Sequence, residues 1–318
     1  MRIAAIVNPF SGRRKAKRQW PILLQSLGNE AKRVDTFWSE YPGHSESIAA
    51  SVRRSGYDRV IAVGGDGTLF EVLNGLWWED NGDMPTVGTL PFGTGCDYVR
   101  NFEIGTGMAE RLQTAVSGPA VKVSLGRCRY ELQGGIRQRV FAMVLGLGFD
   151  AEVVYRYEKS RLRSCWLSYA FAALTCLREL RAFSIDGTLD DSTFQTDAVF
   201  FGAAVGCCLG KGMRIAPGAS PSSNRFECIL ATPVSPLRLL SPILRAYLRQ
   251  HVYSPNITRI KASRAKIRLA EPIRFEADGQ LLGRTSMIEM DLIPEAFSFA
   301  GNILEQHSRN QSTKTKNF

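Results

Sequence analysis

The sequence predicts an α/β domain with a parallel sheet, followed by a second domain of mainly antiparallel β structure. In the first third of the chain a strand, a glycine-containing loop and a helix repeat several times. From about Ser117 the pattern changes to alternating apolar and polar runs, which is typical of antiparallel strands. The length of 318 residues, with 44% hydrophobic and 22% charged residues, fits about two domains with sizeable cores.

The first domain is predicted as a series of strand, loop and helix units. Strands are expected at Arg2–Val7, Arg33–Trp38, Tyr57–Val63 and Thr86–Leu90. Helices are expected to open at Arg13–Arg18 and to cover Ser45–Ser55 and Leu69–Trp78. Such units form a Rossmann-like parallel sheet with covered faces, whose ligands bind at the carboxyl ends of the strands. The glycine-rich loops of this sequence fall at those ends.

The second domain is expected to contain several short strands and two helical segments. The strands are predicted at Ala120–Leu125, Arg127–Leu132, Arg137–Val144, Ala198–Val205, Thr258–Leu269 and Ile273–Ala277. The helical segments are predicted at Arg161–Arg181 and Pro236–Gln250. Residues 1–118 then form the first domain, to which 288–305 return as a last strand, and 119–287 form the second. The polar stretch 306–318 is expected to be a flexible tail.

Composition limits the classes of partner. The 40 Lys and Arg residues exceed the 30 Asp and Glu residues, and the formal charge of +10 favours anionic partners. Nucleic acid is the least favoured of these, because no recognised nucleic-acid motif accompanies the charge. The seven cysteines include no Cys-x-x-Cys pair, which argues against a disulfide framework or a zinc ribbon and for a reducing cytosol.

No segment of the sequence is predicted to span a membrane. The longest apolar run, Cys165–Leu177, has about 13 residues, whereas a spanning helix needs about 20. Its basic flanks are Arg161, Arg163, Arg178 and Arg181. The run is interpreted as a core helix or, alternatively, as the wall of an apolar groove or a face that rests on a membrane surface.

The glycine-rich loop Gly64-Gly65-Asp66-Gly67-Thr68 carries the clearest chemical signal. Successive N–H groups that point outward at a helix N-terminus bind phosphate well. A carboxylate in such a loop, Asp66, would repel the phosphate unless a cation or a proton-donating substrate lay against it. The loop therefore indicates metal-assisted phosphoryl transfer, with a purely structural turn as the alternative.

Five spaced motifs together resemble the diacylglycerol kinase catalytic family. They are Asn8-Pro9-Phe10-Ser11-Gly12, Gly64-Gly65-Asp66-Gly67-Thr68, Pro91-Phe92-Gly93-Thr94-Gly95-Cys96-Asp97-Tyr98, Gly146-Leu147-Gly148-Phe149-Asp150-Ala151 and Phe275-Glu276-Ala277-Asp278-Gly279-Gln280. The family includes bacterial lipid kinases and the sphingosine and ceramide kinases, and it shares its fold with NAD kinases. The match covers nearly the whole chain.

The resemblance implies a nucleotide-binding α/β domain, a β-sandwich-like second domain, and ATP with Mg²⁺ as cofactors. The cofactor contacts map onto Asn8, Ser11, Ser39, Gly64, Gly65, Gly67, Thr68, Thr94, Gly95 and Gln280. Asp278 resembles the general base of the bacterial enzymes, and Asp66 the residue given that role in sphingosine kinases. We assign Asp278 as the base and Asp66 to metal and phosphate, while a structural Asp-Gly turn stays open for Asp278. Acceptor contacts are expected at Asp97, Asp150 and Glu152.

Three motifs depart from the family pattern. Cys96 stands where most members have Asn, and Gln280 stands where most have Glu. Ser223 and Asn224 stand where the family has Asp-Gly, which puts a second, structural metal in doubt.

The resulting prediction is an ATP- and Mg²⁺-dependent lipid kinase that acts on diacylglycerol, giving phosphatidic acid, or on a ceramide-like or sphingoid lipid. It is expected in the cytoplasm, at the inner face of the membrane, where a basic surface meets anionic lipid. Whether the protein forms a homodimer is left open. The alternatives are a kinase of a soluble hydroxyl substrate such as NAD, and a pseudokinase that binds lipid or nucleotide without turnover.

Overall fold

The computed structural model of the protein describes all residues except 78–83, 160–165, 236–237, 239–244, 246–253 and 305–318. The predicted helix at Pro236–Gln250 and the predicted tail therefore lie wholly or largely outside the described residues. The chain forms two compact units, one of Met1–Leu125 with Pro294–Ile303, the other mainly of Gly126–Ile293.

The first unit is built on a parallel sheet. Its strands are β1 (Ile3–Val7), β2 (Val34–Trp38), β3 (Arg59–Gly64) and β4 (Thr86–Pro91), in the order β2-β1-β3-β4. The end of β15 (Gln280–Ala300) lies parallel to β4, with Phe299 opposite Val87. Strands β1, β3 and β4 are short, almost wholly buried apolar runs, as expected where helices cover both faces, whereas the edge strand β2 is only partly buried. The predicted parallel α/β class is confirmed.

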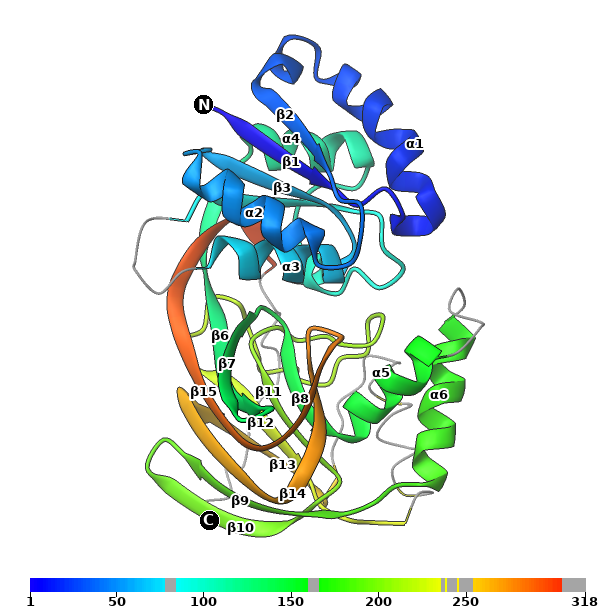
Figure 1. The fold of residues 1–318 in the computed structure, drawn as a ribbon, viewed down its shortest axis with the longest axis vertical. Coiled ribbons are helices and arrows are strands. Elements are labelled where there is room, and N and C mark those ends of the chain that lie inside the picture. Colours follow the sequence, from blue (N-terminus) through cyan, green and yellow to red (C-terminus); the bar gives the residue numbers. More distant parts are fainter. Residues whose placement is uncertain (78–83, 160–165, 236–237, 239–244, 246–253, 305–318) are drawn as a thin grey trace. The chain divides into compact units, whose positions relative to one another are not determined.

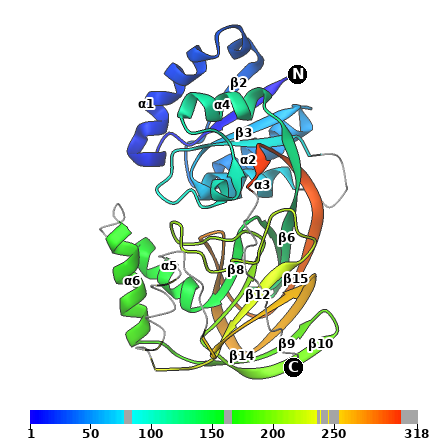
Figure 2. The same ribbon diagram turned by 180° about the vertical axis from the view of Figure 1, so that it is seen from behind.

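Helices cover both faces of this sheet. They are α1 (Ser11–Ser26), α2 (His44–Arg54), α3 (Asp66–Leu76) and α4 (Met108–Ser117). Helices α1 and α4 pack on one face, where Trp20 and Leu112 contact the core that includes Ile61, and α2 and α3 lie on the other (Figures 1 and 2). The unit also has 3-10 turns η1 (Gly28–Arg33) and η2 (Tyr98–Asn101) and a small sheet of β5 (Phe102–Glu103) and β16 (Asn302–Ile303).

The second unit is an antiparallel β-sandwich. Its strands are β6 (Ala120–Leu132), β7 (Gly135–Phe141), β8 (Val144–Gly148), β9 (Phe183–Leu189), β10 (Ser192–Ala198), β11 (Phe200–Ala204), β12 (Phe226–Ala231), β13 (Ile257–Ala262), β14 (Arg264–Ala277) and most of β15. The order is β13-β12-β11-β8-β14-β15, with β9 also beside β14 and β6 beside β15. Strand β14 shifts register between Arg268 and Ile273, around Pro272, so its first half pairs with β9 and its second half with β8.

Two helices, α5 (Phe149–Lys159) and α6 (Trp166–Arg178), pack against each other beside this sandwich. Helix α6 lies within the predicted helical segment, but α5 was not predicted. The run from Val153 to Tyr157 is rich in β-branched and aromatic residues, whose intrinsic preference is for strands. Packing of Val153 against Ala173 and Cys176 of α6 outweighs that preference. Within the described ranges, no helix combines the length and apolar character needed to cross a bilayer.

Candidate active site

Three loops meet at the carboxyl ends of β1, β3 and β4. The amide of Asn8 donates from Nδ2 to Oγ1 of Thr68 at 3.2 Å, which joins the first loop to the second. The N–H of Phe92 donates to the carbonyl oxygen of Gly64 at 2.7 Å, which joins the second to the third. A Cβ on Gly93 would lie only 2.6 Å from the Cα of Gly65. Gly65 and Gly93 have no room for a side chain because the two backbones are in contact.

The segment that follows Asn8 has an unusual backbone. Gly12, Arg13 and Arg14 have φ values of 58°, 56° and 66°, so the regular part of α1 begins later than the predicted opening at Arg13. The left-handed conformation costs roughly 1–2 kcal/mol for an ordinary residue. Such strain concentrates at functional sites, and here it lies in the segment predicted to bind phosphate. A Cβ on Gly12 would meet the carbonyl oxygen of Phe92 at 2.4 Å.

Asp66 is the first residue of α3 and ties its loop to the loop after β4. Its Oδ2 accepts the N–H of Asp97 at 3.0 Å, and its Oδ1 accepts the N–H of Tyr98 at 3.3 Å. Asp97 is buried and forms an ion pair with Arg100 at 3.1 Å. Burial, together with the charge of Asp97, raises the pKa of Asp66 to about 6. A cation beside these carboxylates would favour the ionised form.

Cys96 occupies a position that suits the family's Asn better than a thiol. Its φ of 51° is left-handed, a conformation in which Asn is enriched. The thiol donates only a weak bond to the carbonyl oxygen of Gly93 at 3.3 Å. Burial, followed by the charge of Asp66, raises the pKa of the Cys96 thiol to about 12. The thiol therefore stays protonated and unreactive at neutral pH.

Of the remaining predicted nucleotide residues, four follow the strands of this sheet, whereas Gln280 begins β15 in the second unit, where it pairs with Ala277. Ser39 is buried directly after β2, and its N–H donates to the carbonyl oxygen of Val7 at 2.9 Å. Ser11 donates its N–H to the carbonyl oxygen of Asn8 at 3.2 Å. Thr94 is exposed, and the carbonyl oxygen of Gly95 accepts a bond from the Arg100 guanidinium at 3.2 Å.

Glu71 of α3 supports this edge and was not found from the sequence. Its carboxylate accepts the N–H groups of Gly43 at 2.9 Å and Ser45 at 3.2 Å, which caps the start of α2. No local signal marks it, because its partners lie far from it in the chain.

In the second unit, Asp278 lies in a two-residue hairpin turn. Ala277 pairs with Gln280 across β14 and β15, and Asp278 and Gly279 both have positive φ, as the favoured hairpin turns require. The Asp278 side chain is also an anchor, since its buried carboxylate accepts the N–H groups of Ala142, Met143 and Val144 at 2.7, 2.8 and 3.0 Å. At least three of its about four acceptor positions are therefore occupied.

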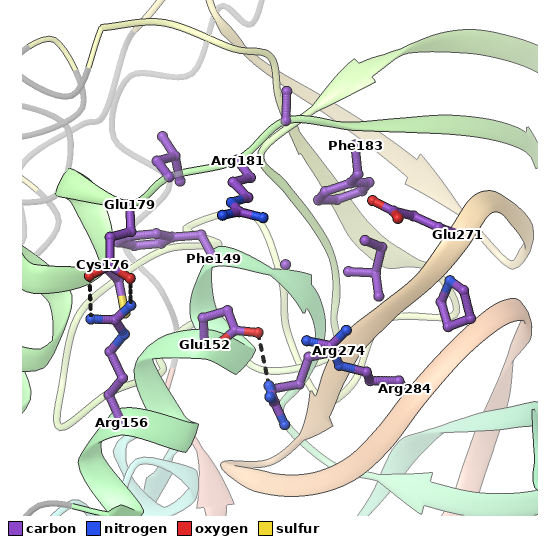
Figure 3. Close-up of a pocket in the computed structure, with 15 residues that line it drawn as sticks. Phe149, Glu152, Arg156, Cys176, Glu179, Arg181, Phe183, Glu271, Arg274 and Arg284 are labelled. Atoms are coloured by element: carbon purple, nitrogen blue, oxygen red, sulfur yellow. Dashed lines mark hydrogen bonds and ion pairs between the residues drawn. The ribbon is translucent and has the colours of Figure 1, made fainter.

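The predicted acceptor residues Asp150 and Glu152 lie in different surroundings. The Asp150 carboxyl is buried beside Glu276. Glu152 lines a pocket of about 340 Å³ and binds the Arg274 guanidinium, with 2.8 Å between Oε1 and Nε (Figure 3). Both residues therefore have partners within the protein, and their contact with the acceptor stays a prediction.

Apolar and charged side chains both line the pocket around Glu152 (Figure 3). Its lining includes Phe149, Phe183 and Ile273 together with four arginines and three glutamates, namely Arg156, Arg181, Arg274, Arg284, Glu152, Glu179 and Glu271. Arg156 and Glu179 form an ion pair, as do Arg274 and Glu152. Arg274 and Arg284 stand opposite each other on β14 and β15, an unfavourable arrangement unless an acid or an anion lies between them. The sequence did not indicate this pocket.

Ser223, which stands where the family has Asp, stabilises its turn through its own hydroxyl. The Ser223 hydroxyl donates to the carbonyl oxygen of Arg225 at 2.8 Å and accepts its N–H at 3.1 Å, so the hydroxyl closes the turn locally. In the part of the chain that the structure describes, no group of three or more His, Cys, Asp or Glu residues is placed to hold a metal.

Two family models match most of the chain. A diacylglycerol kinase catalytic domain model matches residues 2–128, and a YegS C-terminal NAD kinase beta sandwich-like domain model matches residues 143–300. A diacylglycerol kinase of Bacillus subtilis is 26% identical over 89% of this chain and 90% of its own length. One from Staphylococcus aureus is 25% identical over 95% of this chain and 93% of its own length.

Solved structures show the same fold. A diacylglycerol kinase from Bacillus anthracis matches 95% of this chain and 97% of its own with a TM-score of 0.72 and 18% identity. Yeast NADH kinase matches 96% of this chain and 84% of its own with a TM-score of 0.57 and 12% identity. Fold and loops thus define a two-domain kinase related in fold to the NAD kinases. Within that class, the chain belongs to the diacylglycerol kinase catalytic family, as its sequence motifs indicated.

Proposed function

We propose that the protein is a lipid kinase that transfers the γ-phosphate of ATP to the hydroxyl of diacylglycerol. The contact among the three loops after β1, β3 and β4 is the observation that carries this proposal, because it gathers backbone N–H groups and small hydroxyls at one edge of a parallel sheet. The names of the B. subtilis and S. aureus relatives support diacylglycerol as the acceptor.

The nucleotide phosphates are assigned to this edge of the first unit. Gly65, Gly67 and Thr68 lie at the start of α3, where N-terminal N–H groups and the helix dipole favour anions. Asn8 and Ser11 supply polar side chains beside them, and the left-handed turn at Arg13 and Arg14 adds two cationic side chains.

Asp66 fits Mg²⁺. This ion commonly takes one or two carboxylate oxygens and completes its shell with phosphate and water oxygens, so a nucleotide-bound ion needs no all-protein cage. The mutual repulsion of Asp66 and Asp97 supports the choice, because a cation would relieve it. A bound Mg²⁺ would neutralise charge on the transferred phosphate.

Asp278 is assigned as the residue that orients the acceptor hydroxyl and takes its proton. The three N–H groups from residues 142–144 hold its carboxylate in one place, which suits a positioned base. The same bonds make Asp278 important for stability, so a loss of activity in Asp278→Asn must be compared with its thermal unfolding.

The pocket around Glu152 favours an uncharged acceptor over a protonated sphingoid amine. Its arginines outnumber its glutamates, and Glu152 itself is already paired with Arg274. Next to it, α6 presents two exposed apolar side chains, Phe171 with 68% and Leu174 with 49% of their surface accessible. Together with the net charge of +10, they fit contact with an anionic membrane surface.

Radiolabelled ATP and Mg²⁺ in mixed micelles with diacylglycerol, ceramide, sphingosine, phosphatidylglycerol or NAD test the proposal. We expect labelled phosphatidic acid, its loss in Asp66→Asn and Asp278→Asn, and unchanged turnover in the surface control Asp186→Asn. Label in NAD would favour a soluble-substrate kinase. ATP binding without any labelled product would favour a pseudokinase.

A further inference from the structure

Asp150 of α5 and Glu276 of β14 form a buried pair of acids in the second unit. The exposed fraction is 7% for Asp150 and 0% for Glu276. Glu276 lies opposite Gly146 in the β14–β8 register, and a Cβ on Gly146 would fall 1.6 Å from Oδ2 of Asp150. The missing side chain of Gly146 thus leaves the space that the Asp150 carboxyl fills, next to Glu276.

One oxygen of each carboxyl has a backbone donor. Oδ1 of Asp150 accepts the N–H of Ala151 at 2.8 Å, and Oε2 of Glu276 accepts the N–H of Gly279 at 2.6 Å. The other two oxygens, Oδ2 of Asp150 and Oε1 of Glu276, are buried and receive no hydrogen bond from an N–H or O–H of the described residues.

A single proton accounts for both of these oxygens. Two ionised carboxylates in contact inside a protein would each lack a donor and would repel each other. Protonation turns one of them into a donor for the other, so that both oxygens are satisfied. Burial raises the pKa of both groups, and the charge of Asp150 raises the pKa of Glu276 further, which places the proton on Glu276.

We propose that Glu276 keeps its proton at neutral pH, donates it from Oε1 to Oδ2 of Asp150, and thereby holds the Asp278–Gly279 turn in position. Through its other oxygen, Glu276 binds the N–H of Gly279, the residue that follows Asp278. Glu276 and Asp150 are positioning residues, since they act on the turn and not on the reacting atoms. The effect on catalysis rests on the proposed function; the shared proton does not.

Loss of this proton would strain the turn. The charges that act on Glu276 include those of Asp150, from α5, and of Asp278, from the turn itself, and both are acidic. Ionised Glu276 would therefore be repelled by both carboxylates, and the bond to Gly279 would have to move with it. Activity should fall on the alkaline side by up to about tenfold per pH unit.

Infrared spectroscopy of the full chain from about pH 5 to about pH 10 tests the shared proton without any need for catalysis. We expect the carbonyl band of a protonated carboxylic acid in the wild type at pH 7, and its loss in Glu276→Gln. The matched control is Glu227→Gln, which alters a buried glutamate that is paired with Arg259 at 3.2 Å and should keep the band.

Absence of the band from the wild type at pH 7, or its persistence in Glu276→Gln, would overturn the proposal. If Glu276→Gln does not fold, Asp150→Asn provides the second test, because removal of the neighbouring negative charge, which raises the pKa of Glu276, should move the loss of the band to lower pH. An unmoved loss would contradict the pairing.

The pH profile of kcat tests the positioning role. The side-chain amide introduced by Glu276→Gln keeps both hydrogen bonds but cannot ionise, so this variant should lose the alkaline decline of the wild type. An identical decline in both proteins would contradict a positioning role for Glu276. If the wild type is inactive but still shows the band, the proposed kinase function is refuted, whereas the proposed shared proton is supported.

Discussion

Replacement of Gly12 by Ala tests whether the contact between the loops after β1 and β4 is needed for nucleotide binding. Gly12 has a φ of +58°, and a Cβ there would lie 2.4 Å from the carbonyl oxygen of Phe92. Gly28 is a matched control within the same unit, because it also has a φ of +58° but no atom within 4 Å of the added Cβ. The difference between Gly12→Ala and Gly28→Ala isolates the close approach.

The magnitude follows from these distances. Both variants bear the cost of a left-handed Ala, roughly 1–2 kcal/mol. For an ordinary contact the Phe92 oxygen would have to lie at 3.4 Å or more, so it must move by about 1 Å in Gly12→Ala. Overpacking of this kind costs about 1–3 kcal/mol more. A displacement of about 1 Å in groups that position a substrate can lower kcat/KM by about 100-fold.

Two measurements decide the outcome. Denaturant unfolding should show Gly12→Ala to be less stable than Gly28→Ala by about 1–3 kcal/mol. Initial rates at varied ATP should show the fall in kcat/KM for Gly12→Ala alone. If the two variants match in stability and in kcat/KM, the loop contact contributes to neither stability nor nucleotide use. Glycine at position 12 would then be needed only for its left-handed backbone conformation.

Further predictions concern single residues of both units. Cys96→Asn should raise the free energy of unfolding by about 0.5–1 kcal/mol, measured by denaturant unfolding, because Asn adopts the left-handed conformation more readily; a loss of stability would contradict this. The wild-type Cys96 thiol, with its pKa raised to about 12, should resist alkylation at neutral pH in the folded protein, as peptide mapping would show. Asp66, whose pKa rises from 3.8 to about 6, should contribute about 3 kcal/mol of stability that is fully present below pH 3.8 and lost as the pH rises through about 6. Asp66→Asn should remove that slope, and Mg²⁺·ATP affinity of the wild type should weaken below about pH 6. Gly146→Ala, which puts a methyl group into the space of the Asp150 carboxyl, should destabilise the protein by several kcal/mol in thermal unfolding, and a near-neutral effect would show that the carboxyl can move away.

The features that could be predicted from the sequence are those that local patterns determine. Apolar runs between glycine loops predicted β1, β3 and β4, and the Asp278-Gly279 pair predicted its hairpin turn. Helix α5 could not be predicted, because packing on α6 overrides the strand preference of its own residues. The links from Glu71 to the start of α2, and from Asp278 to residues 142–144, join positions far apart in the chain. Local patterns contain no information about such partners.

The two carboxylates proposed for catalysis are both held by backbone N–H groups, so hydrogen bonding alone does not separate their proposed roles. Asp66 accepts N–H groups from residues 97 and 98, and Asp278 accepts them from residues 142–144. Their charged neighbours do differ. Asp66 lies beside Asp97, whose charge raises its pKa, and two such carboxylates favour a cation. Beside Asp278, the shared proton would leave Glu276 neutral, so the need for a cation is smaller there. The difference in neighbouring charge therefore favours Asp66 for the metal and leaves Asp278 for the acceptor hydroxyl.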